Sequence, residues 1–122
     1  AKGQYKVFEL DALQNHTGFN KHFKDKLDAI EINNKLETFD LTNNPDRPVS
    51  NTNASVRLNH FAYIDPALFK IEFETYIYNN VVALLSYDKD DIFGVEIYND
   101  KLARQQEQLF DLLWSQSKNL SD

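Results

Sequence analysis

The second half of the chain constrains the fold most strongly, because its apolar residues follow strand spacing in three consecutive segments. From Phe69 to Tyr78 successive side chains alternate, which is typical of a half-buried strand. Asn79-Asn80 suits a tight hairpin turn with positive φ. Val81–Tyr87 is then a continuous apolar run, as in a strand covered on both faces. After a turn at 88–91, alternation resumes over 93–98 and predicts an antiparallel meander of three strands.

A helix is predicted to follow the meander. Asn99 or Asp100 can cap its start, and its pattern runs on to about Lys118. Apolar residues at 102, 109 and 113 and at 103, 110 and 114 form one stripe along it. We expect the stripe to pack on the third strand of the meander, with Trp114 as the main buried side chain. The residues expected to receive it are Phe93, Val95 and Ile97.

The first half of the chain is less regular. Tyr5–Leu10 alternates and predicts a first strand, and the apolar spacing over 19–30 predicts an N-terminal helix. The spacing over 36–41 is compatible with another strand. Residues 42–55 contain two of the three prolines and few apolar side chains, so we expect a long, exposed, flexible loop. Together these segments predict one domain over 1–122 of the α/β (α+β) class, with a mostly antiparallel sheet and both helices packed on it.

Composition excludes several classes of function. The net charge of −6 and a pI near 5.0 argue against a free-standing nucleic-acid binder, which normally presents a basic face or a high pI. There is no cysteine, so disulfides, thiol nucleophiles and thiolate metal sites are excluded. No apolar run approaches the roughly 18–20 residues of a membrane helix. The chain starts at Ala1 and contains no methionine, so we expect a fragment or a processed product of a longer chain.

Catalytic and metal-binding patterns are weak. His22, Lys24 and Asp28 approach the His-x-Lys-x-x-x-x-Asp signature of phospholipase D-type enzymes. However, Asp28 comes one residue too early, and the local spacing is that of a helix, which puts His22 and Lys24 on different faces. The three histidines are not spaced as metal ligands. We therefore expect no catalytic residue, no metal and no other cofactor.

Three residues are candidates for a binding surface. Tyr76 and Tyr78 leave the same face of their predicted strand, and the opposite face carries Phe73. Apolar groups on both faces indicate either a ligand pocket or dimer surface, or a sheet with a helix on each side. His60, which follows the long loop, is the third candidate.

Residues 71–118 also carry a resemblance to a known family, most clearly in three segments. They read Ile-Tyr-Asn-Asn-Val-Val-Ala over 77–83, Gly-Val-Glu-Ile-Tyr-Asn over 94–99 and Phe-Asp-Leu-Leu-Trp over 110–114. In these segments the chain resembles the C-terminal part of the TrmB-like transcription regulators of archaea and bacteria. It departs from that family at Asn79, where glycine is usual, and at Asn80, where lysine is usual. The resemblance implies a phospholipase D-like effector half-domain that has lost the catalytic motif and follows a DNA-binding winged helix.

The expected function is a non-catalytic regulatory, effector or dimerisation domain of a prokaryotic transcription regulator. We expect a cytoplasmic homodimer that does not bind nucleic acid by itself or a membrane, and that can take a small-molecule effector. Two alternatives stay open. One is a phosphodiesterase-type half-domain that is active as a dimer, with His22 and Lys24 as its chemistry. The other is a free-standing, secreted binding or adaptor domain.

Overall fold

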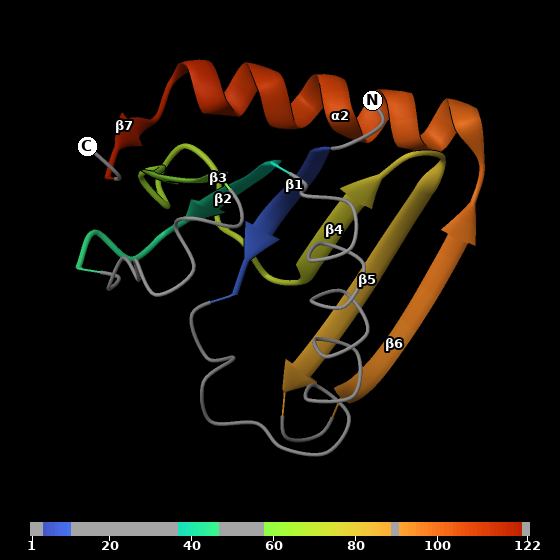
Figure 1. Cartoon of the computed structure of the whole chain (residues 1–122). Helices are drawn as coiled ribbons and strands as arrows, with labels where there is room; N and C mark the ends of the chain where they lie inside the picture. The colour runs from blue at the N-terminus through green and yellow to red at the C-terminus, as the bar shows by residue number, and fades with distance from the viewer. Residues whose placement is uncertain (1–3, 11–36, 47–57, 89–90, 121–122) are drawn as a thin grey trace.

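The computed structural model describes residues 4–10, 37–46, 58–88 and 91–120. Within them the chain forms seven strands and one helix (Figure 1). The elements are β1 (Gln4–Glu9), β2 (Glu37–Thr42), β3 (Leu58–Tyr63), β4 (Glu74–Tyr78), β5 (Val81–Asp88), β6 (Asp91–Tyr98), α2 (Asp100–Ser115) and β7 (Lys118–Asn119). No helix among the described residues is long and apolar enough to cross a membrane.

All seven strands belong to one sheet, in the order β6-β5-β4-β1-β2-β3-β7. β4, β5 and β6 form the predicted antiparallel meander, and β1 pairs antiparallel with β4. β1, β2 and β3 run parallel to one another, and β7 pairs antiparallel with β3. The sheet is therefore mixed, which confirms the α+β class. The N-terminal helix predicted over 19–30 lies outside the described residues.

The predicted turn and helix start are both confirmed. Asn79 has a φ of 50°, a region that asparagine enters more readily than most residues. Tyr78 pairs directly with Val81, so the β4–β5 turn has the two residues expected. At the start of α2, the Asn99 side chain accepts a hydrogen bond from the Leu102 main-chain N–H at 2.9 Å. Asn99 is thus the N-cap.

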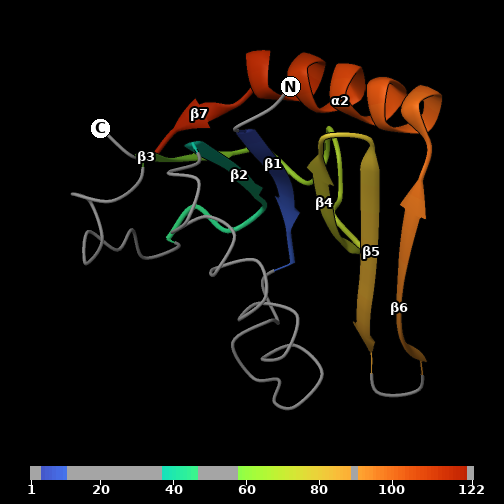
Figure 2. The ribbon, with the colours of Figure 1, turned by 45° about the vertical axis from the view of Figure 1, so that its right-hand side comes forward.

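The surface that receives α2 differs from the prediction. α2 crosses the end of the strands at which the β4–β5 turn lies (Figures 1 and 2). It packs against β1, β4 and β5, and Phe110 is its most buried aromatic residue, 1% exposed. The prediction that Phe93 and Val95 receive the helix is wrong, since each is 40% exposed. Asn99 follows β6 directly and caps α2, so the helix begins at the end of β6. The helix then crosses the end of the sheet, and the middle of β6 stays uncovered by it.

The core lies between α2 and the face of the sheet that carries Phe8, called the α2 face below. The Phe8 ring contacts Phe69 and Phe110, with centroid separations of 5.3 and 5.1 Å. Alternation along β1 puts Lys6 on the same face, and the register aligns Lys6 with Phe39 and His60. The buried members of this core are Phe8, Leu41, Ala62, Ile64, Ile71, Ile77 and Phe110.

The middle of the chain brings further corrections. β4 begins only at Glu74, so the predicted strand does not start at Phe69. β2 runs to Thr42, which is fully buried, so the predicted loop over 42–55 does not begin at its first residue. Residues 47–57 lie outside the described residues. No sequence pattern indicates β3, because neighbouring Phe61 and Ala62 are both buried and the strand does not alternate.

Candidate functional site

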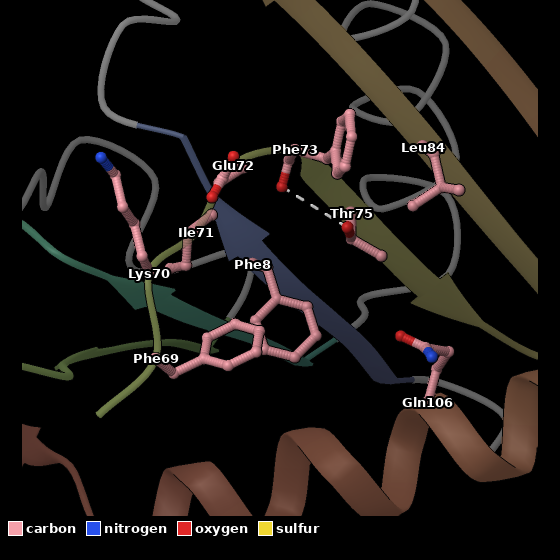
Figure 3. A pocket seen from close by; sticks show the side chains of 9 residues that line it. All are labelled: Phe8, Phe69, Lys70, Ile71, Glu72, Phe73, Thr75, Leu84 and Gln106. Atoms are coloured by element: carbon pink, nitrogen blue, oxygen red, sulfur yellow. Dashed lines mark hydrogen bonds between the residues drawn. The ribbon is translucent and has the colours of Figure 1, made fainter. Parts of the chain in front are cut away.

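An open cavity of about 440 Å³ lies on the α2 face of the sheet (Figure 3). Its walls come from β1, β4, β5, α2 and the segment 69–73. The lining residues are Phe8, Phe69, Lys70, Ile71, Glu72, Phe73, Thr75, Leu84 and Gln106. Apolar side chains predominate, and a few polar groups stand among them. This combination is the usual form of a small-molecule site.

One wall of the cavity is held by Asn43, the residue after β2. Its Nδ2 donates to the carbonyl oxygens of Ile64 at 2.9 Å and Phe69 at 3.0 Å. Its Oδ1 accepts from the main-chain N–H of Ile71 at 2.7 Å. The amide thereby satisfies three main-chain groups that do not take part in the sheet. This explains why residues 69–73 leave the sheet although their side chains alternate.

Aromatic rings form the floor and the outer wall. Phe8 and Phe69 make the floor and are continuous with the core. Phe73 and Leu84 stand on the side away from α2 (Figure 3). Phe73 meets Phe93 of β6 edge to face at 5.8 Å, yet Phe73 stays 43% exposed. An apolar ligand in the cavity would remove such ring surface from water.

A cluster of charges fixes α2 to β1. The Lys6 Nζ lies 2.8 Å from Glu107 Oε2 and 2.8 Å from Asp111 Oδ1. Burial alone would lower the pKa of Lys6, but the hydrogen bonds and charges of Asp111 and Glu107 together outweigh it and raise that pKa. The hydrogen bond from Lys6 also lowers the pKa of Glu107. The two contacts of Lys6 therefore hold α2, which carries Gln106, against β1.

Tyr76 and Tyr78 lie on the face opposite α2, because Ile77 between them is aligned with the α2-facing Lys6 of β1. The Tyr78 hydroxyl donates to Glu96 at 3.0 Å, and both tyrosines are half-buried. Burial raises the pKa of Tyr78, and the Glu96 carboxylate raises it further. The two candidate tyrosines are thus partly packed and hydrogen-bonded within the chain.

His60 lies on the α2 face, so the sheet separates it from both tyrosines. Its ring stacks on Phe39 with centroids 4.7 Å apart, and its Nε2 lies 2.8 Å from Glu37 Oε2. Phe39 in turn meets Trp114 edge to face at 5.6 Å. The structure does not bring the three sequence candidates together, and none of them lines the cavity.

Two polar residues that sequence reasoning misses hold this part of the fold. Asn43 is one, and its place in a polar, proline-containing segment conceals its role. The other is Glu74, which is 1% exposed and accepts hydrogen bonds from the Leu10 N–H at 2.8 Å and the Tyr76 hydroxyl at 2.5 Å. Alternation assigns Glu74 to a solvated face, so no sequence signal marks it. In the described part of the chain, no group of three histidine, aspartate or glutamate side chains could hold a metal ion.

Comparisons with known proteins bear on the fold. No model of a protein family matches the chain, and no curated protein matches it. Among the solved structures that match, that of the protein TrmBL2 aligns with 98% of this chain at a TM-score of 0.63. The fold is similar to part of TrmBL2. TrmBL2 is an archaeal chromatin protein whose structure shows a novel mode of DNA binding. The sequences are 13% identical, and this chain spans 46% of the TrmBL2 chain. At the level of the fold, the likeness agrees with the resemblance of residues 71–118 to TrmB-like regulators.

Proposed function

We propose that this chain is a non-catalytic regulatory domain of a transcription regulator and that it binds a small-molecule effector in the cavity of Figure 3. The observation that carries the proposal is the likeness to TrmBL2 over nearly the whole of this chain but under half of TrmBL2. A unit of this fold therefore occurs there within a larger protein that binds DNA. The resemblance of residues 71–118 to TrmB-like regulators supports the same role, and with it a cytoplasmic location.

The chemistry of the cavity supports the effector-binding part of the proposal. Phe8, Phe69 and Leu84 offer apolar surface, while the Gln106 amide can donate and accept hydrogen bonds. A ligand that suits this lining has an aliphatic or aromatic body and one polar end that reaches Gln106.

We further propose that the chain neither binds DNA by itself nor catalyses a reaction. A net charge of −6 opposes phosphate binding, because affinity for DNA depends on clustered cations. The enzymatic alternative rests on His22 and Lys24, which lie outside the described residues. Among the described residues the one histidine is His60, which is stacked and paired with Glu37.

Thermal-shift measurements with a metabolite panel test the effector site. The cavity variant is Gln106→Trp, whose indole would fill the space beside α2. Its matched control is Gln105→Trp, because Gln105 is exposed on the same helix. A compound at a hundredfold excess over its dissociation constant should stabilise the chain by about 2.7 kcal/mol. We expect such compounds to stabilise the wild type and Gln105→Trp but not Gln106→Trp. Equal stabilisation of both variants would place the ligand elsewhere.

DNA binding is tested by a mobility shift with short duplex DNA at low salt. We expect no shift at micromolar protein. Micromolar or tighter binding would contradict the assignment of DNA contacts to another part of the regulator.

A further inference from the structure

The two edges of the sheet are built differently. At one edge β3 is covered by β7, which is two residues long and carries Lys118. A short strand and a lysine are common protections against unwanted pairing. At the other edge β6 is eight residues long and contains no proline or lysine. No described strand pairs with its outer side (Figures 1 and 2). A long, open edge of this kind is a template for another strand.

The main-chain groups on the outer side of β6 follow from its ladder with β5. Val81 is paired with Tyr98, and beyond that pair the Asn99 N–H donates to the Asn80 carbonyl oxygen at 2.9 Å. Hydrogen-bonded and non-hydrogen-bonded pairs alternate in an antiparallel ladder. Residues 93, 95 and 97 therefore bond to β5, and the residues between them turn their N–H and C=O groups outward. The outward set is Ile92, Gly94, Glu96 and Tyr98.

We propose that β6 pairs antiparallel with β6 of a second copy of this chain, centred on Val95. A two-fold axis at Val95 places residue 94 opposite residue 96, and residue 92 opposite residue 98, of the other copy. In this register the outward N–H and C=O groups of residue 94 face those of residue 96, and the groups of residue 92 face those of residue 98. A two-fold centre at any other residue of β6 leaves at least one of the four without a counterpart inside the strand. The inference is independent of the effector proposed for the cavity.

The side chains are self-complementary in the same register. On the α2 face, Val95 lies opposite Val95 of the other copy, and Phe93 lies opposite Ile97. Phe93 and Val95 are each 40% exposed in the single chain, so pairing buries apolar surface at the centre of the contact. On the other face Glu96 lies opposite Gly94. No carboxylate therefore stands directly opposite another, although the chain carries a net charge of −6. This complementarity identifies a second copy as the occupant.

The proposed contact adjoins the cavity. Leu84 of the cavity wall pairs with Val95, and Phe73 of the same wall contacts Phe93. The second copy would thus pack against the side of the cavity that lies away from α2.

Single cysteine variants test the register, because the chain contains no cysteine of its own. In the proposed contact, Val95 and its copy form a non-hydrogen-bonded pair with Cα atoms about 4.5 Å apart, within the separation that a disulfide spans. We expect Val95→Cys to form a covalent dimer under mild oxidation. Leu112→Cys, at a 62% exposed apolar site on α2, is the control and should stay monomeric on the same time scale. Equal rates for the two variants would overturn the proposal.

A mixture tests the centre of the contact. Phe93→Cys and Ile97→Cys chains should cross-link with each other faster than either does with itself, because the axis places 93 opposite 97. Self-linkage that is as fast as linkage in the mixture would overturn a centre at Val95.

Sedimentation velocity tests the contact without covalent chemistry. The wild type should be a dimer, and Val95→Lys and Val95→Glu should each raise the dimer dissociation constant at least about tenfold through like charges at the axis. An equimolar mixture of the two should restore the dimer, while Leu112→Lys should leave it intact. Circular dichroism melts establish that each variant is folded. A wild type that stays monomeric at the highest soluble concentration, or a mixture that does not reassociate, would overturn the proposal.

Discussion

Replacing Asn43 by alanine should destabilise the chain by about 2–3 kcal/mol. The Asn43 amide makes three hydrogen bonds to main-chain groups, with donor–acceptor distances from 2.7 to 3.0 Å. A net contribution of about 1 kcal/mol for each bond accounts for the upper figure. Asn43 is half-buried, so in Asn43→Ala water can form hydrogen bonds with some of the main-chain groups that have lost the amide. This replacement by water accounts for the lower figure.

Urea unfolding followed by far-ultraviolet circular dichroism measures this loss. Small domains unfold with a slope of about 1–3 kcal/mol per molar urea, so the midpoint should fall by about 0.7–3 M. The matched control is Asn80→Ala at the exposed β4–β5 turn, which should change stability by no more than about 0.5 kcal/mol. Hydrogen exchange at the Ile71 N–H should also become faster in Asn43→Ala, because its acceptor is gone. Equal midpoints for the two variants would refute the role of Asn43 in holding the cavity wall.

Three further predictions concern the packing and the titrating groups. Trp114→Ala should lower the free energy of unfolding by about 2–3 kcal/mol, which is less than the loss for a fully buried aromatic residue. The reason is that Trp114 is half-buried between Phe39 and Phe110. Circular dichroism melts measure this loss. The lowered pKa of Glu107 contributes stability above its ordinary value of 4.5, and this is lost as pH falls through the lowered value. Urea midpoints of the wild type and Glu107→Gln should therefore differ at neutral pH and converge in stronger acid. The raised pKa of Tyr78 contributes stability that is lost as pH rises above 10.0, so Tyr78→Phe should lose less stability in alkali than the wild type. A uniform alkaline response of the two proteins would contradict the Tyr78–Glu96 contact.

The sequence predicted those parts of the fold that depend on residues close together in the chain. The β4–β5 hairpin follows from Asn79, whose φ of 50° suits a two-residue turn. The start of α2 follows from Asn99, because a capping side chain acts on an N–H three residues later. β1 and β2 lie where alternation predicted them, within one residue at each end.

Contacts between distant segments could not be predicted from the same signals. The parallel pairing of β1, β2 and β3 joins segments far apart in the sequence, and no local pattern specifies it. Residues 69–73 do not form the predicted strand, because Asn43, more than twenty residues earlier, makes hydrogen bonds with the main-chain groups of Phe69 and Ile71. The packing surface of α2 was wrong for a related reason, since side-chain periodicity gives the buried face of a helix but not the direction in which the helix crosses the sheet.

The sequence indicated aromatic residues on both faces of β4, but it did not indicate which face carries the cavity. Tyr76 and Tyr78 were candidates because they are large side chains on one face of β4. The cavity lies on the other face, where Phe73 and Thr75 line it. A cavity depends on where α2 stops covering the sheet, and that is a property of the assembled layers.

An amide chemical-shift titration of the isotope-labelled chain locates the effector site residue by residue. The titrant is a compound that stabilises the wild type but not Gln106→Trp in the thermal-shift panel. If the cavity is the effector site of a regulatory domain, saturable shifts should be largest at Ile71, Phe73 and Thr75. Shifts that centre instead on His60 or on Tyr76 and Tyr78 would show that the cavity is not the effector site.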